Sequence, residues 1–174
     1  MKNTFTLLFF FIVCAVSAQT KLVPADKSIE TKWIKDEKYT MSWYTVRGTV
    51  KFEIAKVVTT IDAGADKLNI YTDVQIRNAK TQWADTTIVA LPSLKPVYHS
   101  SYNLERETVI NYGKTITGHN EIKADKKRTP INETLKGVFF DSSFYPYLIR
   151  LLPLKEGYTK DIAIYDFNPA KTVW

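Results

Sequence analysis

The chain is poor in the residue types on which many active sites and metal sites depend. Its 174 residues include one cysteine and two histidines, and its six glycines are isolated from one another. A framework of disulfides is therefore excluded. Without a Cys pair or an H-x-x-x-H pair, the sequence has no recognisable zinc site, and no glycine-rich loop is present that could hold a phosphate. We expect no metal and no cofactor, and we predict no catalytic residues.

The sequence also lacks an apolar run long enough to cross a bilayer comfortably. Residues 1–18 instead have the layout of a secretory signal peptide, with a basic Lys2, an apolar Leu7–Val16 and a small-residue site at Val16-Ser17-Ala18. A membrane anchor is disfavoured because the run is too short. We expect cleavage after this site, export to the periplasm or outer envelope of a bacterium, and a mature chain without a transmembrane span.

Cys14 offers a second interpretation of the same segment, namely lipid attachment. Bacterial lipoprotein signals usually place a small residue before the cysteine, and Val13 stands there instead. Lipid attachment is therefore the weaker alternative. Cleavage after Ala18 would leave the mature chain without any cysteine, so the fold would be held by burial alone.

The charge of the chain is basic but dispersed. The formal net charge is +6, and the densest basic run is Lys123–Arg128. We interpret this run as a solvated turn, with contact to acidic lipid headgroups or polysaccharide as the weaker alternative. Export makes nucleic acid an improbable partner.

Most of the remaining chain alternates between apolar and polar residues, as strands do. Residues 19–38 are polar and predict a leader, and residues 39–174 predict a single β-rich domain. No alternation of strands with helices is present, so we expect an antiparallel sheet. The predicted strands are Tyr39–Arg47, Thr49–Thr60, Lys67–Ala79, Gln82–Leu91, Val97–Leu104, Glu107–Tyr112, Lys114–Lys123 and Asp161–Phe167, while Thr129–Gly137 is ambiguous between strand and loop.

One segment, Val138–Leu154, has the pattern of a helix. Its apolar residues recur with helical spacing, Asp141 or the serines after it could cap its start, and Pro153 ends it. We predict that it packs against the sheet. The residues expected in the core are Phe140, Phe144, Leu148 and Leu151.

Three stretches together resemble a bacterial envelope family of unknown function. They are Asp141–Gly157, Thr87–Val97 and Tyr39–Tyr44, and the resemblance spans Tyr39 to Phe167. It implies a mainly β (α+β) fold: a curved antiparallel sheet or half-barrel, similar to periplasmic lipoprotein carriers, with one apolar helix on its concave face. Relatives usually continue with further strands, so we expect that Trp174 is a premature end that leaves a sheet edge unpaired.

Aromatic residues provide the candidate ligand site. Ten tyrosines and four tryptophans occur in the chain, and such side chains suit a ligand-lined groove as well as a core. We predict that one concave surface is lined by Trp43, Trp83, Tyr98, Tyr102, Phe144, Tyr147 and Leu148.

The other polar candidates predict no site by themselves. His99 and His119 are interpreted as surface or edge histidines. Asp73, Asp85 and Glu121 could act as acid and base only if two of them met across the sheet. Solvated surface charges are the default interpretation for these carboxylates.

These observations support three hypotheses of different classes. The first is a non-enzymatic exported domain that binds an apolar or amphipathic molecule, such as a lipid, an acyl chain or a lipoprotein-like ligand. The second is a structural or interaction module that docks on an envelope protein complex. The third, an enzyme that acts on envelope polymers, is the least favoured because it requires the paired carboxylates or a histidine near a carboxylate.

Overall fold

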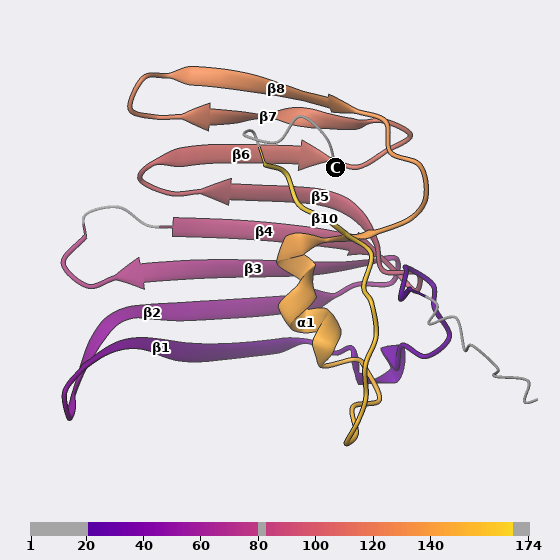
Figure 1. The fold of residues 1–174 in the computed structure, drawn as a ribbon, viewed down its shortest axis with the longest axis horizontal. Coiled ribbons are helices and arrows are strands. Elements are labelled where there is room, and N and C mark those ends of the chain that lie inside the picture. Colours follow the sequence, from indigo (N-terminus) through magenta and orange to yellow (C-terminus); the bar gives the residue numbers. More distant parts are fainter. Residues whose placement is uncertain (1–20, 80–82, 169–174) are drawn as a thin grey trace, which may run out of the picture.

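The structure, a computed structural model, describes residues 21–79 and 83–168 and consists of one large sheet with a thin covering layer. Eight strands follow one another in sequence order, and every neighbouring pair is antiparallel (Figure 1). The strands are β1 Glu37–Arg47, β2 Val50–Ala63, β3 Lys67–Ile76, β4 Trp83–Ala90, β5 Lys95–Tyr102, β6 Arg106–Asn111, β7 Ile116–Ile122 and β8 Lys127–Glu133. The prediction of a mainly β antiparallel fold is confirmed.

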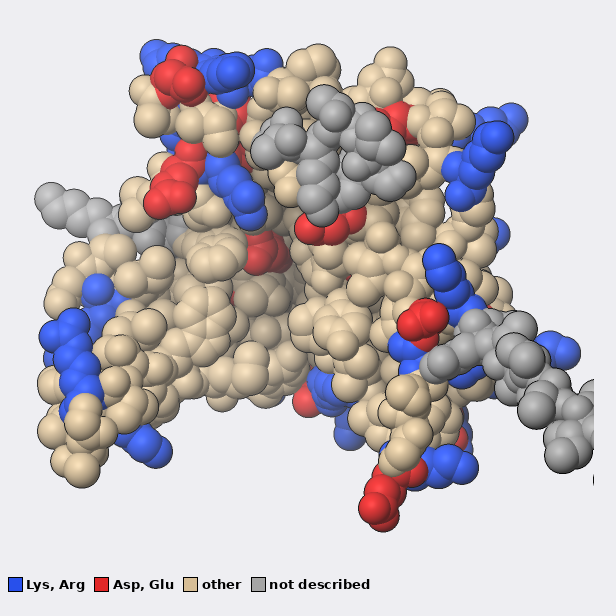
Figure 2. Space-filling view, viewed as in Figure 1, with Lys and Arg blue, Asp and Glu red and all other residues tan. Residues whose placement is uncertain are grey.

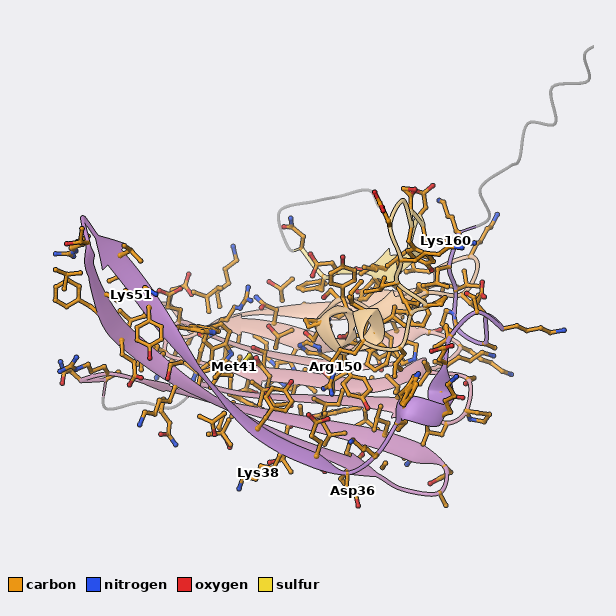
Figure 3. The ribbon with its side chains drawn as sticks, turned by 90° about the horizontal axis from the view of Figure 1, so that it is seen from below. Asp36, Lys38, Met41, Lys51, Arg150 and Lys160 are labelled. Carbon is orange, nitrogen blue, oxygen red and sulfur yellow. The ribbon has the colours of Figure 1, made fainter. Side chains whose placement is uncertain are left out.

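The sheet is curved and open. β1 and β8 lie at its two edges and do not pair with each other, and Figure 3 shows the sheet bending toward the side that carries the helix. Register shifts between Trp43 and Tyr44 and between Ile88 and Val89 mark β-bulges, which increase local twist and bending. This curved, open sheet agrees with the half-barrel that the family resemblance implies.

The first hairpin extends beyond the rest of the sheet. β1 and β2 pair from Glu37↔Ile61 to Arg47↔Val50, whereas β2 pairs with β3 only from Ala55 onward. Gly48, with a φ of +62°, lies at the first position of its two-residue turn, where a positive φ favours glycine. Residues 44–54, hereafter the hairpin end, therefore form a two-stranded ribbon that projects past β3.

The prediction of one helix over Val138–Leu154, in the covering layer, is wrong in its extent. Only Tyr145–Ile149 is α-helical (α1), preceded by a 3-10 turn at Ser142–Phe144 (η2) and by strand β9, Phe140–Asp141. β9 pairs in parallel with β10, Ile164–Tyr165, and the Phe140 amide donates to the Ala163 carbonyl. This external partner holds the start of the segment extended, so the helix begins at Tyr145, seven residues later than predicted.

The helix also ends earlier than predicted. The amides of Arg150, Leu151 and Leu152 each donate to the carbonyl three residues before, which is the tighter 3-10 pattern. A cap predicted from the sequence is confirmed, because the Asp141 carboxylate accepts from the Ser143 amide at the start of η2. Pro146 lies in the first turn of α1, where proline is tolerated.

The main core lies between α1 and strands β2 to β4. Phe140, Phe144, Leu148 and Leu151 are fully buried there, as predicted. They pack against sheet residues that include Ile61, Leu68, Ile70 and Val89. Burial of this kind supplies most of the favourable free energy of folding.

Residues 21–36, expected as a polar leader, contribute to the same core. Leu22 and Ile29 are buried in it, and a short 3-10 turn, η1, follows at Thr31–Trp33. The Leu22 amide donates to the Asp161 carbonyl, and the Ala163 amide donates to the Leu22 carbonyl. This segment is thus hydrogen-bonded to residues 161–163, which lead into β10.

Two smaller clusters complete the concave face. One lies under β9 and β10 and joins Ile110, Ile116 and Ile131 of the sheet to Tyr165. The other consists of Ala55, Val57 and Val74 with Trp83 packed against it. Within the described residues, no helix has the length and apolar character needed to cross a membrane.

Candidate functional site

The concave face of the middle strands carries two adjacent rows of side chains. Residues directly opposite each other in an antiparallel sheet share a face, so the pairing register assigns each row. One row comprises Asp85, Ser101, Thr108 and Asn120, and the next comprises Thr87, His99, Ile110 and Gly118.

These rows are polar and nevertheless buried. His99, Ser101, Thr108 and Asn120 each have less than a tenth of their surface exposed. The Thr108 hydroxyl donates to Asn120 Oδ1 at 2.8 Å. The covering segment, residues 139–167, lies over these rows and supplies a partner to His99 through Asp141. Buried polar groups need such partners.

Gly118 allows the strands beneath this site to approach closely. Its φ is +154°, and a Cβ built there would lie 1.9 Å from the Val109 carbonyl oxygen. Only glycine fits that position without displacing the backbone of β6.

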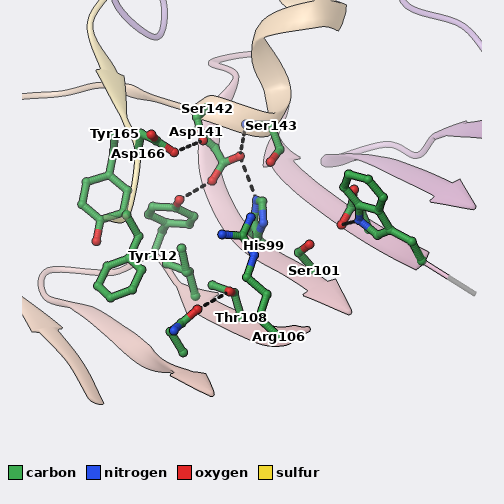
Figure 4. A pocket seen from close by; sticks show the side chains of 15 residues that line it. His99, Ser101, Arg106, Thr108, Tyr112, Asp141, Ser142, Ser143, Tyr165 and Asp166 are labelled. Carbon is green, nitrogen blue, oxygen red and sulfur yellow. Dashed lines mark hydrogen bonds and ion pairs between the residues drawn. The ribbon is translucent and has the colours of Figure 1, made fainter. Parts of the chain in front are cut away.

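Asp141 connects the covering segment to the polar rows. Its carboxylate is buried and has three partners: His99 Nδ1 at 3.0 Å, the Ser143 amide at 2.7 Å and the Tyr112 hydroxyl (Figure 4). The Tyr112 hydroxyl and the Ser143 amide donate to it. A buried carboxylate needs such partners because its desolvation is costly.

Opposing effects act on the pKa of His99. Burial alone lowers it, but the hydrogen bond and negative charge of Asp141, together with the charge of Asp85, outweigh burial and raise the pKa above its ordinary value. Arg106 acts in the opposite direction. The fold therefore favours the protonated imidazole beside the carboxylate.

The two tyrosines of the site are held in their neutral forms. Burial raises the pKa of Tyr112, and the neighbouring Asp141 carboxylate raises it further. Burial also raises the pKa of Tyr165, followed by the effect of Glu133. Tyr112 is therefore a hydrogen-bond donor to Asp141 across the ordinary pH range.

A cavity of about 140 Å³ lies next to this cluster. Side chains from β4 to β7 line its sheet side, and the covering segment lines the other side. In Figure 4 the Arg106 side chain extends along the His99 ring. The lining residues are Trp83, Asp85, His99, Ser101, Arg106, Thr108, Ile110, Tyr112, Asn120, Asp141, Ser142, Ser143, Tyr165, Asp166 and Phe167.

Two of the predicted ligand-site residues come together beside this cavity. The rings of Trp43 and Trp83 meet edge to face, with centroids 6.1 Å apart and planes at 74°. Trp83 Nε1 donates to Asp85 Oδ1 at 2.9 Å. Trp83 therefore belongs both to the cavity wall and to the apolar cluster formed with Ala55, Val57 and Val74.

The other five predicted residues do not join this surface. Tyr98 and Tyr102 are offset by one residue from His99 and Ser101, so they point to the opposite, convex face. Phe144, Tyr147 and Leu148 are buried in the main core between α1 and the sheet. The prediction that all seven residues share one concave surface is wrong for Tyr98 and Tyr102. Phe144, Tyr147 and Leu148 do lie on the concave side, but they are packed in the core and do not line the cavity.

The expectation for His99 is also corrected, because this histidine is buried rather than at the surface. His119 lies on the convex face, where its Nε2 is 3.0 Å from Glu107 Oε1 and Arg128 Nη2 is 2.9 Å from its Nδ1. Strand alternation could have indicated that His99 and Ser101 share a face. Local sequence patterns did not indicate Tyr112 or Asp141 as part of this site, because each lies on an element separate from that of His99.

No two of the three carboxylates that could have met across the sheet come together, because Asp73 and Glu121 share the convex face but belong to β3 and β7, which three strands separate. Asp85 lies on the concave side, whereas Asp73 and Glu121 pair with residues of the convex side. Among the residues that the structure describes, no group of three His, Cys, Asp or Glu side chains could hold a metal ion.

Comparisons with known proteins place the chain in a family. No curated protein and no solved structure was found to match the chain. One family profile matches residues 38–174, a range that begins at the second residue of β1 and includes every strand of the sheet. The chain therefore belongs to the family described as proteins of unknown function (DUF3108).

Proposed function

We propose that this protein is an exported, non-catalytic domain that binds an amphipathic molecule, such as a lipid, on the concave face of its sheet. The observation that carries the proposal is the position of Trp83, which separates a polar cavity from an apolar strip on the same face. A ligand with a polar group and an apolar part would find both environments side by side.

The apolar strip consists of Met41, Trp43 and Trp83 over the buried cluster Ala55, Val57 and Val74. The register places these residues on one face, and Met41 and Trp43 remain substantially exposed. Exposed aromatic and thioether side chains beside a concave surface are typical of sites for apolar ligands. Figure 2 shows this face hollowed beside the covering segments, with uncharged side chains over most of the hollow.

The polar cavity would hold the polar part of the ligand. It offers hydroxyl groups from Ser101 and Thr108, a carboxylate from Asp85 and the guanidinium of Arg106. His99 and Asp141 hold each other in place and so keep this wall rigid. A rigid, pre-formed wall reduces the entropy cost of binding.

The proposal is tested by identifying what the protein carries and by removing the tryptophan at the junction. The protein purified from its own envelope is extracted, and bound molecules are identified by mass spectrometry against a control protein. We expect a lipid or another amphipathic molecule to be enriched. Recovery of nothing beyond the control, from a protein that also fails to bind a fluorescent fatty acid, would reject the proposal.

The first prediction is that Trp83→Ala weakens fatty-acid binding by about tenfold, because stacking and buried apolar area are lost. Trp33→Ala is the matched control, since Trp33 is an exposed tryptophan that contacts Glu30 and Lys32 away from the concave strip. Fluorescence titration measures both variants after circular dichroism has shown that they are folded. Equal affinities would contradict a site at Trp83.

A second candidate function is a module that docks on an envelope protein. The open edges of the sheet favour it, because β8 has a strand on one side only among the described strands, and open edges pair with strands of a partner. Cross-linking in whole cells through a photoreactive residue at Thr129 of β8 tests this candidate. Absence of a reproducible cross-linked protein would reject it.

A further inference from the structure

The hairpin end, residues 44–54, exposes apolar side chains on both of its faces. Tyr44 and Val46 lie on one face, and Val50 and Phe52 lie on the other. All four are exposed, with Val46 at 60% and Val50 at 51%. The exposure of these side chains on both sides shows that the described part of the chain leaves both faces of this ribbon largely uncovered.

Exposed apolar surface of this extent indicates that another molecule covers the hairpin end. A two-stranded ribbon without a partner layer is only marginally stable in water, and contiguous exposed apolar patches mark interaction sites. The ribbon is also well separated from the main core, and Figure 3 shows it curving away from the sheet on the side that carries α1, with Lys51 near its tip.

The charges of this end indicate what covers it. The hairpin end contains two cations, Arg47 and Lys51, against one carboxylate, Glu53. Glu53 accepts a hydrogen bond from the Ser42 hydroxyl at 2.7 Å. On the face seen in Figure 2, the charged side chains at the lower left, where the hairpin ends, are all Lys or Arg.

We propose that the hairpin end inserts into the surface of a membrane that contains anionic lipids. Val46, Val50 and Phe52 would enter the boundary between headgroups and acyl chains, while Arg47 and Lys51 would extend along the surface to the lipid phosphates. Apolar side chains flanked by cations match such a surface. A second copy of the chain fits less well, because two ends of the same positive charge would be brought together.

This inference does not require the proposed ligand site, because the hairpin end and the cavity beside His99 share no residue. Membrane insertion would support the proposed function, since a domain that binds a lipid would take that lipid from a membrane. The two proposals can fail separately. Trp83→Ala should weaken fatty-acid binding and leave vesicle binding unchanged.

The test is co-sedimentation of the full chain with lipid vesicles. We expect binding to equimolar phosphatidylcholine and phosphatidylglycerol and much weaker binding to phosphatidylcholine alone. The double variant Val46→Ser with Val50→Ser should bind the anionic vesicles about tenfold more weakly, because two apolar side chains are lost from the inserted surface. The matched control is Leu154→Ser with Leu104→Ser, since these residues are 58% and 54% exposed elsewhere in the molecule.

The charges are tested in a separate pair of variants. Arg47→Gln with Lys51→Gln should weaken binding to the anionic vesicles by about fivefold for each lost cation, and added salt should weaken binding of the unchanged protein. Lys114→Gln with Lys155→Gln removes two exposed cations elsewhere and should have little effect. Equal loss in both pairs would show general attraction by net charge and would overturn the proposal.

A fluorescent probe reports which end inserts. An environment-sensitive dye attached at Val50→Cys, in a chain with Cys14→Ser, should shift to the blue on addition of anionic vesicles, whereas the same dye at Leu104→Cys should not. A blue shift at Val50→Cys that depends on protein concentration and not on vesicles would show self-association and would overturn membrane insertion. Equal spectral shifts at the two labelled positions would also overturn membrane insertion of the hairpin end.

Discussion

Asp141 is the residue at which the sheet and its cover are joined. It ends β9, caps η2 through the Ser143 amide, and accepts hydrogen bonds from Tyr112 and from the His99 ring. One carboxylate thus fixes a backbone turn and two side chains that come from β5 and the loop after β6. Removing it would leave three donors without their acceptor, including the buried His99 ring, which is more costly than the loss of one exposed hydrogen bond.

The pH dependence of stability should report the pairing of His99 with Asp141. Because the pKa of His99 is raised in the folded protein, the protonated ring stabilises the fold below the ordinary pKa of an unfolded histidine, about 6.5. This contribution is lost as the pH rises through the raised pKa. The free-energy difference between the unchanged protein and His99→Gln, from urea unfolding, should therefore be largest in mild acid and shrink toward alkaline pH.

A direct measurement separates this effect from general destabilisation. The ring protons of His99, followed by NMR across the same pH range, should titrate above the ordinary histidine value. An ordinary or lowered pKa, together with a free-energy difference that does not vary with pH, would contradict the charged pair.

At the scale of elements, the short helix α1 is held by packing rather than by its own length. Five residues are too few for a helix to be stable alone in water. Two faces of the segment are fixed instead: Phe144 and Leu148 are buried in the core, and Arg150 forms an ion pair with Glu37 of β1 at 2.7 Å. Arg150 also lies over the Tyr39 and Tyr147 rings.

Replacement of Phe144 by alanine tests this docking. The side chain is fully buried and stacks on Phe140 with ring centroids 6.2 Å apart. Its loss should reduce the free energy of unfolding by about 3–5 kcal/mol. Tyr145→Ala, at the exposed neighbouring position, is the control and should cost far less in the same denaturant titration. Equal effects would show that the segment is not docked as described.

The sequence predicted strands better than it predicted what covers them. Alternation in segments such as Lys67–Ala79 specifies a strand because one face of it must be buried, and β3 lies within that range. The helix predicted over Val138–Leu154 was too long because the apolar residues at its start also satisfy helical spacing. In the structure that start is extended, since the Phe140 amide donates to the carbonyl of Ala163, which is distant in sequence. The pairing of His99 with Asp141 joins residues 42 positions apart, and local patterns carry no information on such a contact.

The whole molecule is a sheet with local connections and a cover with distant ones. Every strand from β1 to β8 pairs with its neighbour in the sequence. The cover instead combines residues 21–36 with residues 139–167, and an isolated parallel bridge joins Leu22 to Ile162. The core of the domain therefore includes the segment that the composition alone marks as a polar leader.

Truncation of Leu22 tests that conclusion. Leu22 is fully buried in the main core, so Leu22→Ala should lower the free energy of unfolding by about 2–5 kcal/mol. Lys21→Ala changes the exposed residue next to it and should have little effect. If thermal unfolding of the two variants coincided, residues 21–36 would not be part of the stable fold.

The bridge between Leu22 and Ile162 also sets an order of events during folding. Adjacent strands can pair as soon as each hairpin has been synthesised, since their contacts are close in sequence. The cover cannot close until the segment around Ile162 is present, because Leu22 bonds to the Asp161 carbonyl and to the Ala163 amide. A growing chain must therefore hold the concave face of its sheet open to solvent until residues 161–163 are present, so chaperone protection is needed most before that point.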